Sequence, residues 1–350
     1  MPKNEDMIKK VTLIIFFTFT LRAHALVSKA ECTDVDIRDN MNEQMKEYFS
    51  TPRNQGLIGW CYAFAISDLI SAQIKRPVSA MHIAAMWNQK VENNPFMRLS
   101  WELNRSSKST LQKFYQGAYT AQALKHISKQ NKICSEKDFP FDPTNLKIRS
   151  TIYDFKKLEK IKKTLDESPN LGYQDVKHEL EKLTLLADIM DPQLINILKG
   201  DDLNNAFAKI ALKKCENKEL TLQEFKPKKI KAPNTLRYTG KAWERNLAKQ
   251  KNTKNFFKII NSLLNAHQPM ILTYPLNKVL AQANVPHTNT VIARKWFKNK
   301  CQYKVRNTFG ASCNLYHQNV ITDCNRDEGA FWISDEALLQ IAKSINYISN

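Results

Sequence analysis

The spacing of apolar residues predicts helices in the first half of the chain and strands in its last third. Apolar side chains in YAFAISDLISAQI (62–74) recur close to every third or fourth position, which predicts a half-buried helix. FFKIINSLLNAHQPMILTYP (256–275) predicts a helix and then a strand. Three more strands are expected in HTNTVIARKWF (287–297), QYKVRNTFG (302–310) and GAFWIS (329–334). A helical segment therefore precedes a region rich in strands.

The middle of the chain is helical in pattern and strongly basic. Residues 144–250 predict several amphipathic helices, with KPKKIKAP (226–233) as a linker. Residues 209–258 contain 15 lysines or arginines against 4 glutamates, in a chain whose net charge is +19. Such a segment attracts polyanions, so an acidic polymer or an anionic surface is one expected partner; a solvated helical surface is the alternative. Nucleic acid is not expected as a specific partner, because few aromatic residues are interleaved for base stacking.

The first 25 residues have the pattern of a secretory signal peptide. Lys9 and Lys10 precede an apolar run at 11–21, and AHA (23–25) supplies small residues for cleavage after Ala25. The run is shorter than the roughly 20 residues that span a bilayer, and no later run qualifies as a transmembrane segment. We therefore expect a secreted or periplasmic protein.

Seven cysteines follow the predicted cleavage site, at positions 32, 61, 134, 215, 301, 313 and 324. An oxidising compartment would pair most of them, and the odd number leaves one thiol free. Cys313 with Cys324 is a plausible local bridge, and Cys134 with Cys215 could join distant segments. Which cysteine stays unpaired is the functional question.

Cys61 is the cysteine best placed to act as a nucleophile. It lies in the first turn of the helix predicted at 62–74, after a loop that contains Gly56 and Gly59. At that end, free backbone N–H groups and the helix dipole favour negative charge, which predicts a lowered thiol pKa. An activated thiolate is suited to covalent catalysis.

The segment NQGLIGWCYAF (54–64) resembles the nucleophile segment of the papain-like (C1-type) cysteine peptidases. The resemblance implies that Cys61 is the nucleophile. It also implies that the Gln55 side chain and the Cys61 backbone N–H form an oxyanion hole. Gly59 and Trp60 are then expected to contact substrate. Trp60 stands where the family has a small residue, so we expect it to crowd the cleft.

The resemblance continues in the strand region with a histidine and an asparagine. His287 is the one histidine that heads a predicted strand followed by a second strand and a polar amide. Asn307 opens NTFG (307–310), which is similar to the family's KNSWG motif. By resemblance, His287 is the general base, Asn307 orients its ring, and Phe309 replaces a tryptophan that shields their hydrogen bond.

A third similar stretch begins at residue 117. GAYTAQALKHISKQ resembles the family segment that starts with a Gly-Gly substrate-binding turn, which places Gly117 and Ala118 at the two glycine positions. Cys61 and His287 are 226 residues apart, against about 130 to 150 in the papain pattern. Residues 144–250 account for the excess as an insertion.

The resemblance implies an α+β, papain-like fold of two lobes, a helical lobe with the nucleophile and a β-rich, barrel-like lobe with His287 and Asn307. The predicted parts are a signal peptide (1–25), a helical lobe (26–143), a helical basic insertion (144–250) and a β-rich lobe (251–350). The predicted function is peptide bond hydrolysis through a thioester, endopeptidase action being favoured over exopeptidase, on protein or peptide substrates. Neither a cofactor nor a metal is expected. The alternatives are an inert scaffold that binds polyanions or cell-surface components through the insertion, and an acyl transferase or ligase of the same fold.

Overall fold

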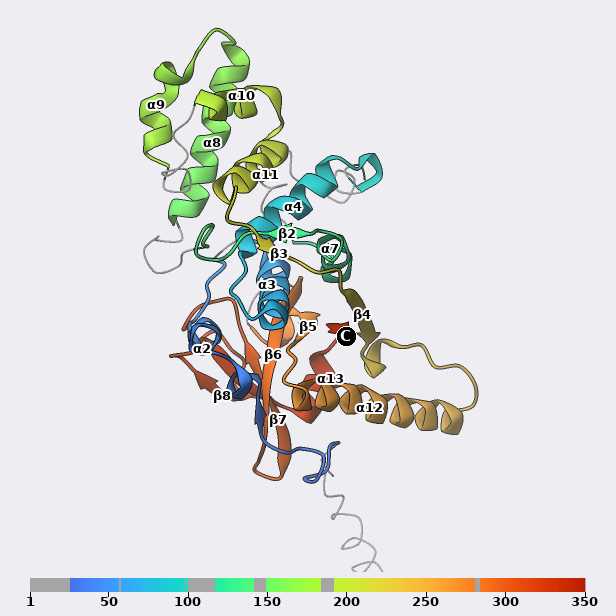
Figure 1. Cartoon of the computed structure of the whole chain (residues 1–350). Coiled ribbons are helices and arrows are strands. Elements are labelled where there is room, and N and C mark those ends of the chain that lie inside the picture. Colours follow the sequence, from blue (N-terminus) through green and yellow to red (C-terminus); the bar gives the residue numbers. More distant parts are fainter. Residues whose placement is uncertain are drawn as a thin grey trace, which may run out of the picture.

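The computed structural model describes residues 26–56, 58–97, 99, 117–141, 149–183, 192–280 and 284–349. The predicted signal peptide lies outside these residues. Helices surround one hydrophobic core, and an antiparallel sheet packs on a second hydrophobic core (Figure 1). The predicted α+β fold of a helical lobe and a β-rich lobe is therefore confirmed. In this described part of the chain, no helix combines the length and the apolar character needed to cross a bilayer.

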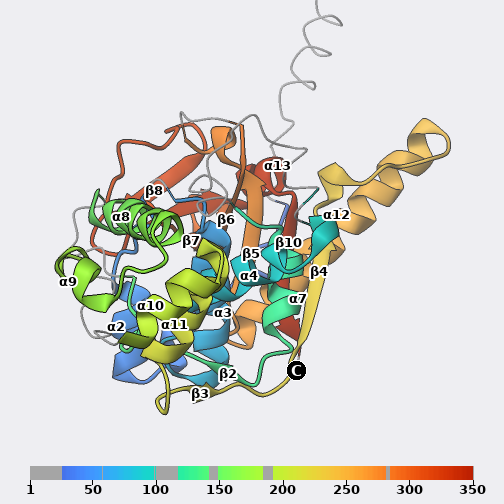
Figure 2. The same ribbon diagram turned by 90° about the horizontal axis from the view of Figure 1, so that it is seen from above.

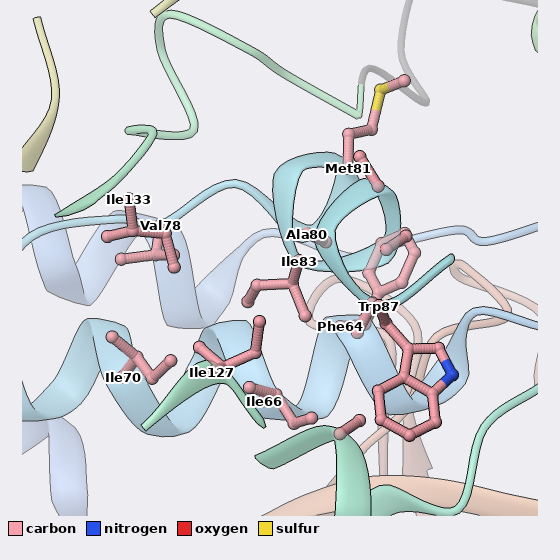
Figure 3. Packing of buried hydrophobic residues seen from close by; sticks show 14 of the residues in the cluster. Phe64, Ile66, Ile70, Val78, Ala80, Met81, Ile83, Trp87, Ile127 and Ile133 are labelled. Carbon is pink, nitrogen blue, oxygen red and sulfur yellow. The ribbon is translucent and has the colours of Figure 1, made fainter. Parts of the chain in front are cut away.

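The helical lobe is built around the helix that begins at the predicted nucleophile. Its helices are α2 (Glu43–Ser50), α3 (Cys61–Ile74), α4 (Ala80–Glu92) and α7 (Thr120–Ile127), and a short 3-10 helix, η1 (Ile37–Asn40), precedes them. Figure 3 shows side chains of α3, α4 and α7 packed together in this core. α3 ends at Ile74 and is capped by Lys75, whose φ of 56° is left-handed and turns the chain out of the helix.

The prediction that α3 is half-buried is wrong. All eleven residues from Cys61 to Ser71 are buried. One side of α3 packs against α4 and α7, and the other lies on strands β5 and β6 of the sheet. A helix between two cores is buried on every side, including at polar positions such as Asp68.

The β-rich lobe is an antiparallel sheet whose middle strands carry the predicted histidine and precede the predicted asparagine. Among the described residues the sheet has eight strands, in the order β4-β10-β5-β6-β7-β9-β8, with β1 paired to part of β6. Their bounds are β1 (Val35–Asp36), β4 (Lys226–Lys231), β5 (Met270–Pro275), β6 (Pro286–Phe297), β7 (Lys300–Arg306), β8 (Ile321–Asn325), β9 (Ala330–Ser334) and β10 (Ser344–Ser349). Helices α12 (Ala242–Asn265) and α13 (Asp335–Ile341) and the 3-10 turns η3 (Pro233–Thr235) and η4 (Leu276–Lys278) belong to this half. The strands predicted at the end of 256–275 and in 287–297, 302–310 and 329–334 are therefore present, although β7 ends at Arg306 and does not include NTFG.

The inserted helices form a third core and join the helical lobe at one end. Their bounds are α8 (Arg149–Glu167), α9 (Tyr173–Glu181), α10 (Pro192–Gly200) and α11 (Leu203–Lys214). They lie beyond α4 on the far side from the sheet (Figures 1 and 2). Phe207 of α11 enters the core of the helical lobe, and the short strands β2 (Lys132–Ile133) and β3 (Leu220–Thr221) pair across the two ends of the insertion.

Two predictions about the end of the insertion are wrong. KPKKIKAP is not a linker, because Lys226–Lys231 form β4 and pair with all six residues of β10. The expected boundary at residue 250 falls inside α12, which is continuous from Ala242 to Asn265. Local composition could not reveal β4, because its partner strand lies more than 100 residues away in sequence.

The disulfides agree with the cysteine predictions. Cys134–Cys215 and Cys313–Cys324 are bonded, as is Cys32–Cys301, a pair that was not singled out in advance. Cys61 is the free cysteine. Since all seven cysteines of the chain lie in described residues, the odd thiol is the one at the start of α3.

Candidate active site

The nucleophile candidate lies between the loop that precedes α3 and the start of β6. In that loop Gly56 has φ of 62° and its N–H donates to Asn54 Oδ1 at 2.9 Å. The Cys61 side chain occupies the first helical position, where the backbone N–H groups have no intrahelical acceptor. The backbone and hydroxyl of Thr288, the residue after His287, both form hydrogen bonds that act on the Cys61 thiol.

Burial raises the pKa of the Cys61 thiol to about 11, although hydrogen bonds from Thr288 and from Tyr62 oppose the rise. The prediction of a lowered pKa is wrong for this conformation. The helix N-terminus does favour the thiolate, but only 7% of the Cys61 surface is exposed, and loss of solvation outweighs the dipole.

His287 is enclosed between two aromatic rings. Its ring stacks on the ring of Phe309, with centroids 4.8 Å apart and planes at 12° to each other. The ring of Tyr274 is nearly perpendicular to it, with centroids 5.5 Å apart. Its Nε2 lies 3.4 Å from Asn307 Oδ1. Burial lowers the pKa of His287 to about 4, and the contact with Asn307 acts in the opposite direction. The imidazole is therefore neutral near pH 7.

Asn307 follows β7 directly and is held by three neighbours besides the histidine. Its Oδ1 accepts from Asn289 Nδ2 at 2.9 Å and from the Thr308 backbone N–H at 2.8 Å, and its Nδ2 donates to the Tyr316 hydroxyl. Asn289 in turn accepts from the Tyr274 hydroxyl. This network fixes the carboxamide oxygen on the side of the His287 ring.

Asn289, Tyr274 and Tyr316 were not singled out from the sequence. Asn289 had one usable signal: it lies two residues after His287 in a predicted strand, and strand geometry places such side chains on the same face. Tyr274 and Tyr316 reach the site from a neighbouring strand and from a loop beside a disulfide, and pairing of that kind is not visible in the sequence.

Gln55 is anchored beside the nucleophile loop. Its backbone N–H donates to Thr308 O at 2.7 Å, its Oε1 accepts from the Thr308 hydroxyl, and its Nε2 donates to Ile58 O at 2.6 Å. A carboxamide nitrogen has two N–H groups, and the contact with Ile58 O uses one of them. The loop that carries Gln55 is thus tied to the residue after Asn307.

The predicted substrate-binding residues fall into two groups. A Cβ placed on Gly117 would lie 3.2 Å from Gly59 O, so these two loops meet next to the start of α3, with Gly117 exposed and Ala118 partly buried. Trp60 is fully buried and stacks on Phe207 of the insertion at 6.2 Å. The prediction that Trp60 contacts substrate and crowds the cleft is wrong for this structure, because its indole faces the core.

A buried cluster of charges connects the elements that contribute to the site. Asp68, on α3 two turns after Cys61, pairs with Arg306, the residue before Asn307, and with Arg53, two residues before Gln55, at 3.1 Å. Thr290 of β6 donates to the other Asp68 oxygen at 2.8 Å. Helix α3, the loop before it and strands β6 and β7 are therefore joined at one carboxylate, which the sequence did not reveal.

The pKa values above predict how the Cys61 thiol responds to pH. Because the thiolate fraction grows about tenfold per pH unit below the pKa, alkylation of Cys61 by iodoacetamide should accelerate continuously from pH 6 to 9.5. Intact mass spectrometry follows the reaction, and glutathione in the same buffers serves as the reference thiol. A rate that is flat between pH 5 and 8 would contradict the raised pKa and indicate a thiolate–imidazolium pair.

Comparison with known proteins gives matches among solved structures only. No family model and no curated protein matches the chain. Similar structures include SERA5E from Plasmodium falciparum (10% identity, TM-score 0.45, covering 90% of this chain and 94% of that one). They also include the bromelain protease from Ananas comosus in complex with the E64 inhibitor (11%, 0.40, 91% and 98%) and xylellain, a cysteine protease from Xylella fastidiosa (12%, 0.42, 91% and 85%).

Proposed function

We propose that this chain is a cysteine peptidase that cleaves peptide bonds within proteins through a thioester on Cys61. The principal support is that the free cysteine begins a helix beside the His287–Thr288 strand end, while Asn307 Oδ1 contacts the ring of His287. A nucleophile, a base and a group that orients the base are the parts that such catalysis requires.

The proposed reaction begins with both groups neutral. His287 accepts the thiol proton as Cys61 Sγ bonds to the substrate carbonyl carbon, and the carbonyl oxygen becomes an oxyanion. The Cys61 backbone N–H and the second Gln55 Nε2–H donate to that oxygen. Protonated His287 then gives its proton to the leaving amine, which leaves a thioester. A water molecule, deprotonated by His287, hydrolyses the thioester and restores the thiol.

The role proposed for Gln55 gives a measurable prediction. Gln55→Ala should lower kcat by about 10²- to 10³-fold with little change in KM, because the oxyanion donor acts on the transition state. Gln130→Ala on the loop after α7 is a matched control that should retain full activity. A rise in KM with unchanged kcat would contradict the role in the oxyanion hole. The measurement is steady-state hydrolysis of fluorescein-labelled casein.

The deciding experiment is labelling with an epoxysuccinyl inhibitor, which alkylates activated thiols. We expect one adduct at Cys61, located by peptide mapping, and strong suppression of the adduct in His287→Ala. His178→Ala, at an exposed position on α9, is the matched histidine control and should label as the parent does. Absence of labelling in the folded parent chain would overturn the proposal.

One observation favours a second function. Cys61 and His287 are buried and both neutral near pH 7, as expected of an inert scaffold that binds other molecules without cleaving them. Failure of the labelling experiment, together with intact folding, would select this alternative.

Three disulfides support the further proposal that the protein works in an oxidising compartment outside the cytoplasm.

A further inference from the structure

The long helix α12 has two halves with different surroundings. Its second half contributes the buried residues Phe256, Phe257, Ile260, Asn261, Leu263 and Leu264, most of them in the core of the β-rich lobe. Every residue from 242 to 255 is exposed or partly exposed. Figures 1 and 2 show this first half projecting beyond the body of the molecule.

Two large apolar side chains lie on the projecting half without contact with the core. Trp243 is 63% exposed and Leu247 is 60% exposed. At about 100° per residue they are one turn apart and share a face, which is rotated by roughly a third of a turn from the buried face of the second half. They therefore do not extend the core stripe, and they form an apolar patch at the tip of the molecule.

The same part of the chain is strongly basic. Residues 237–258 contain seven lysines or arginines and one acidic residue, Glu244. The Glu244 carboxylate is engaged by the backbone N–H of Lys241 at 2.8 Å, at the start of the helix. By helical geometry Lys251, Lys254 and Lys258 lie on the side of the helix that carries Trp243 and Leu247. Apolar patch and positive charge thus face the same way.

We propose that the first half of α12 binds the surface of an anionic lipid bilayer. Trp243 and Leu247 insert at the level between headgroups and acyl chains, where tryptophan is favoured, and the lysines on that side pair with lipid phosphates. A soluble polyanion would use the lysines but leave Trp243 and Leu247 in water. The inference concerns a surface away from Cys61 and does not depend on peptidase activity.

The test measures co-sedimentation of the chain from residue 26 onward with vesicles. The apolar run at 11–21 is omitted because it would bind lipid itself, and every described residue lies within 26–349. We expect binding to phosphatidylcholine vesicles that contain phosphatidylglycerol, little binding to pure phosphatidylcholine, and weakening at high salt. The double variant Trp243→Ala, Leu247→Ser should bind at least tenfold more weakly and melt at the same temperature as the parent.

Matched variants separate the apolar and the charge contributions. Leu315→Ser removes an apolar side chain that is 44% exposed elsewhere and should bind as the parent does. Lys251→Glu should weaken binding about fivefold or more, and Lys160→Glu on α8, with the same change in charge, should not. Failure of the parent to bind anionic vesicles, or binding that is unchanged in the Trp243, Leu247 variant, overturns the proposal. Binding to heparin that survives loss of these two side chains, without vesicle binding, assigns a soluble polyanion instead.

Discussion

Cys61→Ala is expected to lower kcat for labelled casein by about 10⁴-fold or more, to the background of the assay. The reason is that the six other cysteines are in disulfides, so no other thiol can form the thioester. The measurement is initial rates on protein whose fold is verified by its melting temperature. Cys61→Ser, which keeps nearly the same volume, should be almost as inactive.

The kcat of Cys61→Ala shows whether the chain cleaves casein through the Cys61 thiol. If Cys61→Ala cleaves casein as fast as the parent does, the thioester mechanism is excluded. The cleavage then comes from a contaminating protease or from a different site. A matched removal of a buried hydroxyl on the same helix, Ser71→Ala, affects packing and the hydrogen bond to Val78 N–H but should leave kcat within a few fold. The comparison isolates the thiol from general damage to α3.

Asp68→Ala is expected to produce the largest loss of stability, about 3 to 5 kcal/mol in the free energy of unfolding. The change leaves the buried guanidinium group of Arg306 without the carboxylate that it contacts. Arg53 keeps Glu136 at 3.2 Å but loses its second carboxylate, and Thr290 loses its acceptor. Urea denaturation followed by circular dichroism measures the loss. An uncompensated buried charge, not the absent attraction itself, accounts for most of it.

The matched control is Asp166→Ala on α8. Asp166 pairs with Lys162 at 3.0 Å, but its side chain is about half exposed, so its loss should cost less than about 1 kcal/mol. Equal losses for the two variants would contradict a special role for the buried cluster. In Asp68→Asn, kcat should fall more than KM rises, since Asp68 joins α3 to β6, which carries His287, and to β7, which precedes Asn307.

Much of the fold could be predicted because its signals are local. Periodicity predicted the helix at Cys61 and the strands at His287 and before Asn307. The disulfides 134–215 and 313–324 were plausible pairings among several that the sequence left open. β4 could not be predicted, because lysine-rich KPKKIK has weak strand propensity and is held by pairing with β10.

The candidate site shows the same division. From the sequence by itself, the helix pattern favoured Cys61 as a candidate nucleophile, and the resemblance to papain-like peptidases implied His287 as its base and Asn307 as the orienting amide. Only the tertiary structure decided that Trp60 faces the core, that Asn289 and Tyr316 hold Asn307, and that Asp68 joins the parts. It also decided that Cys61 and His287 are neutral at rest, because solvation depends on what the whole fold places around a group, and no local pattern encodes that.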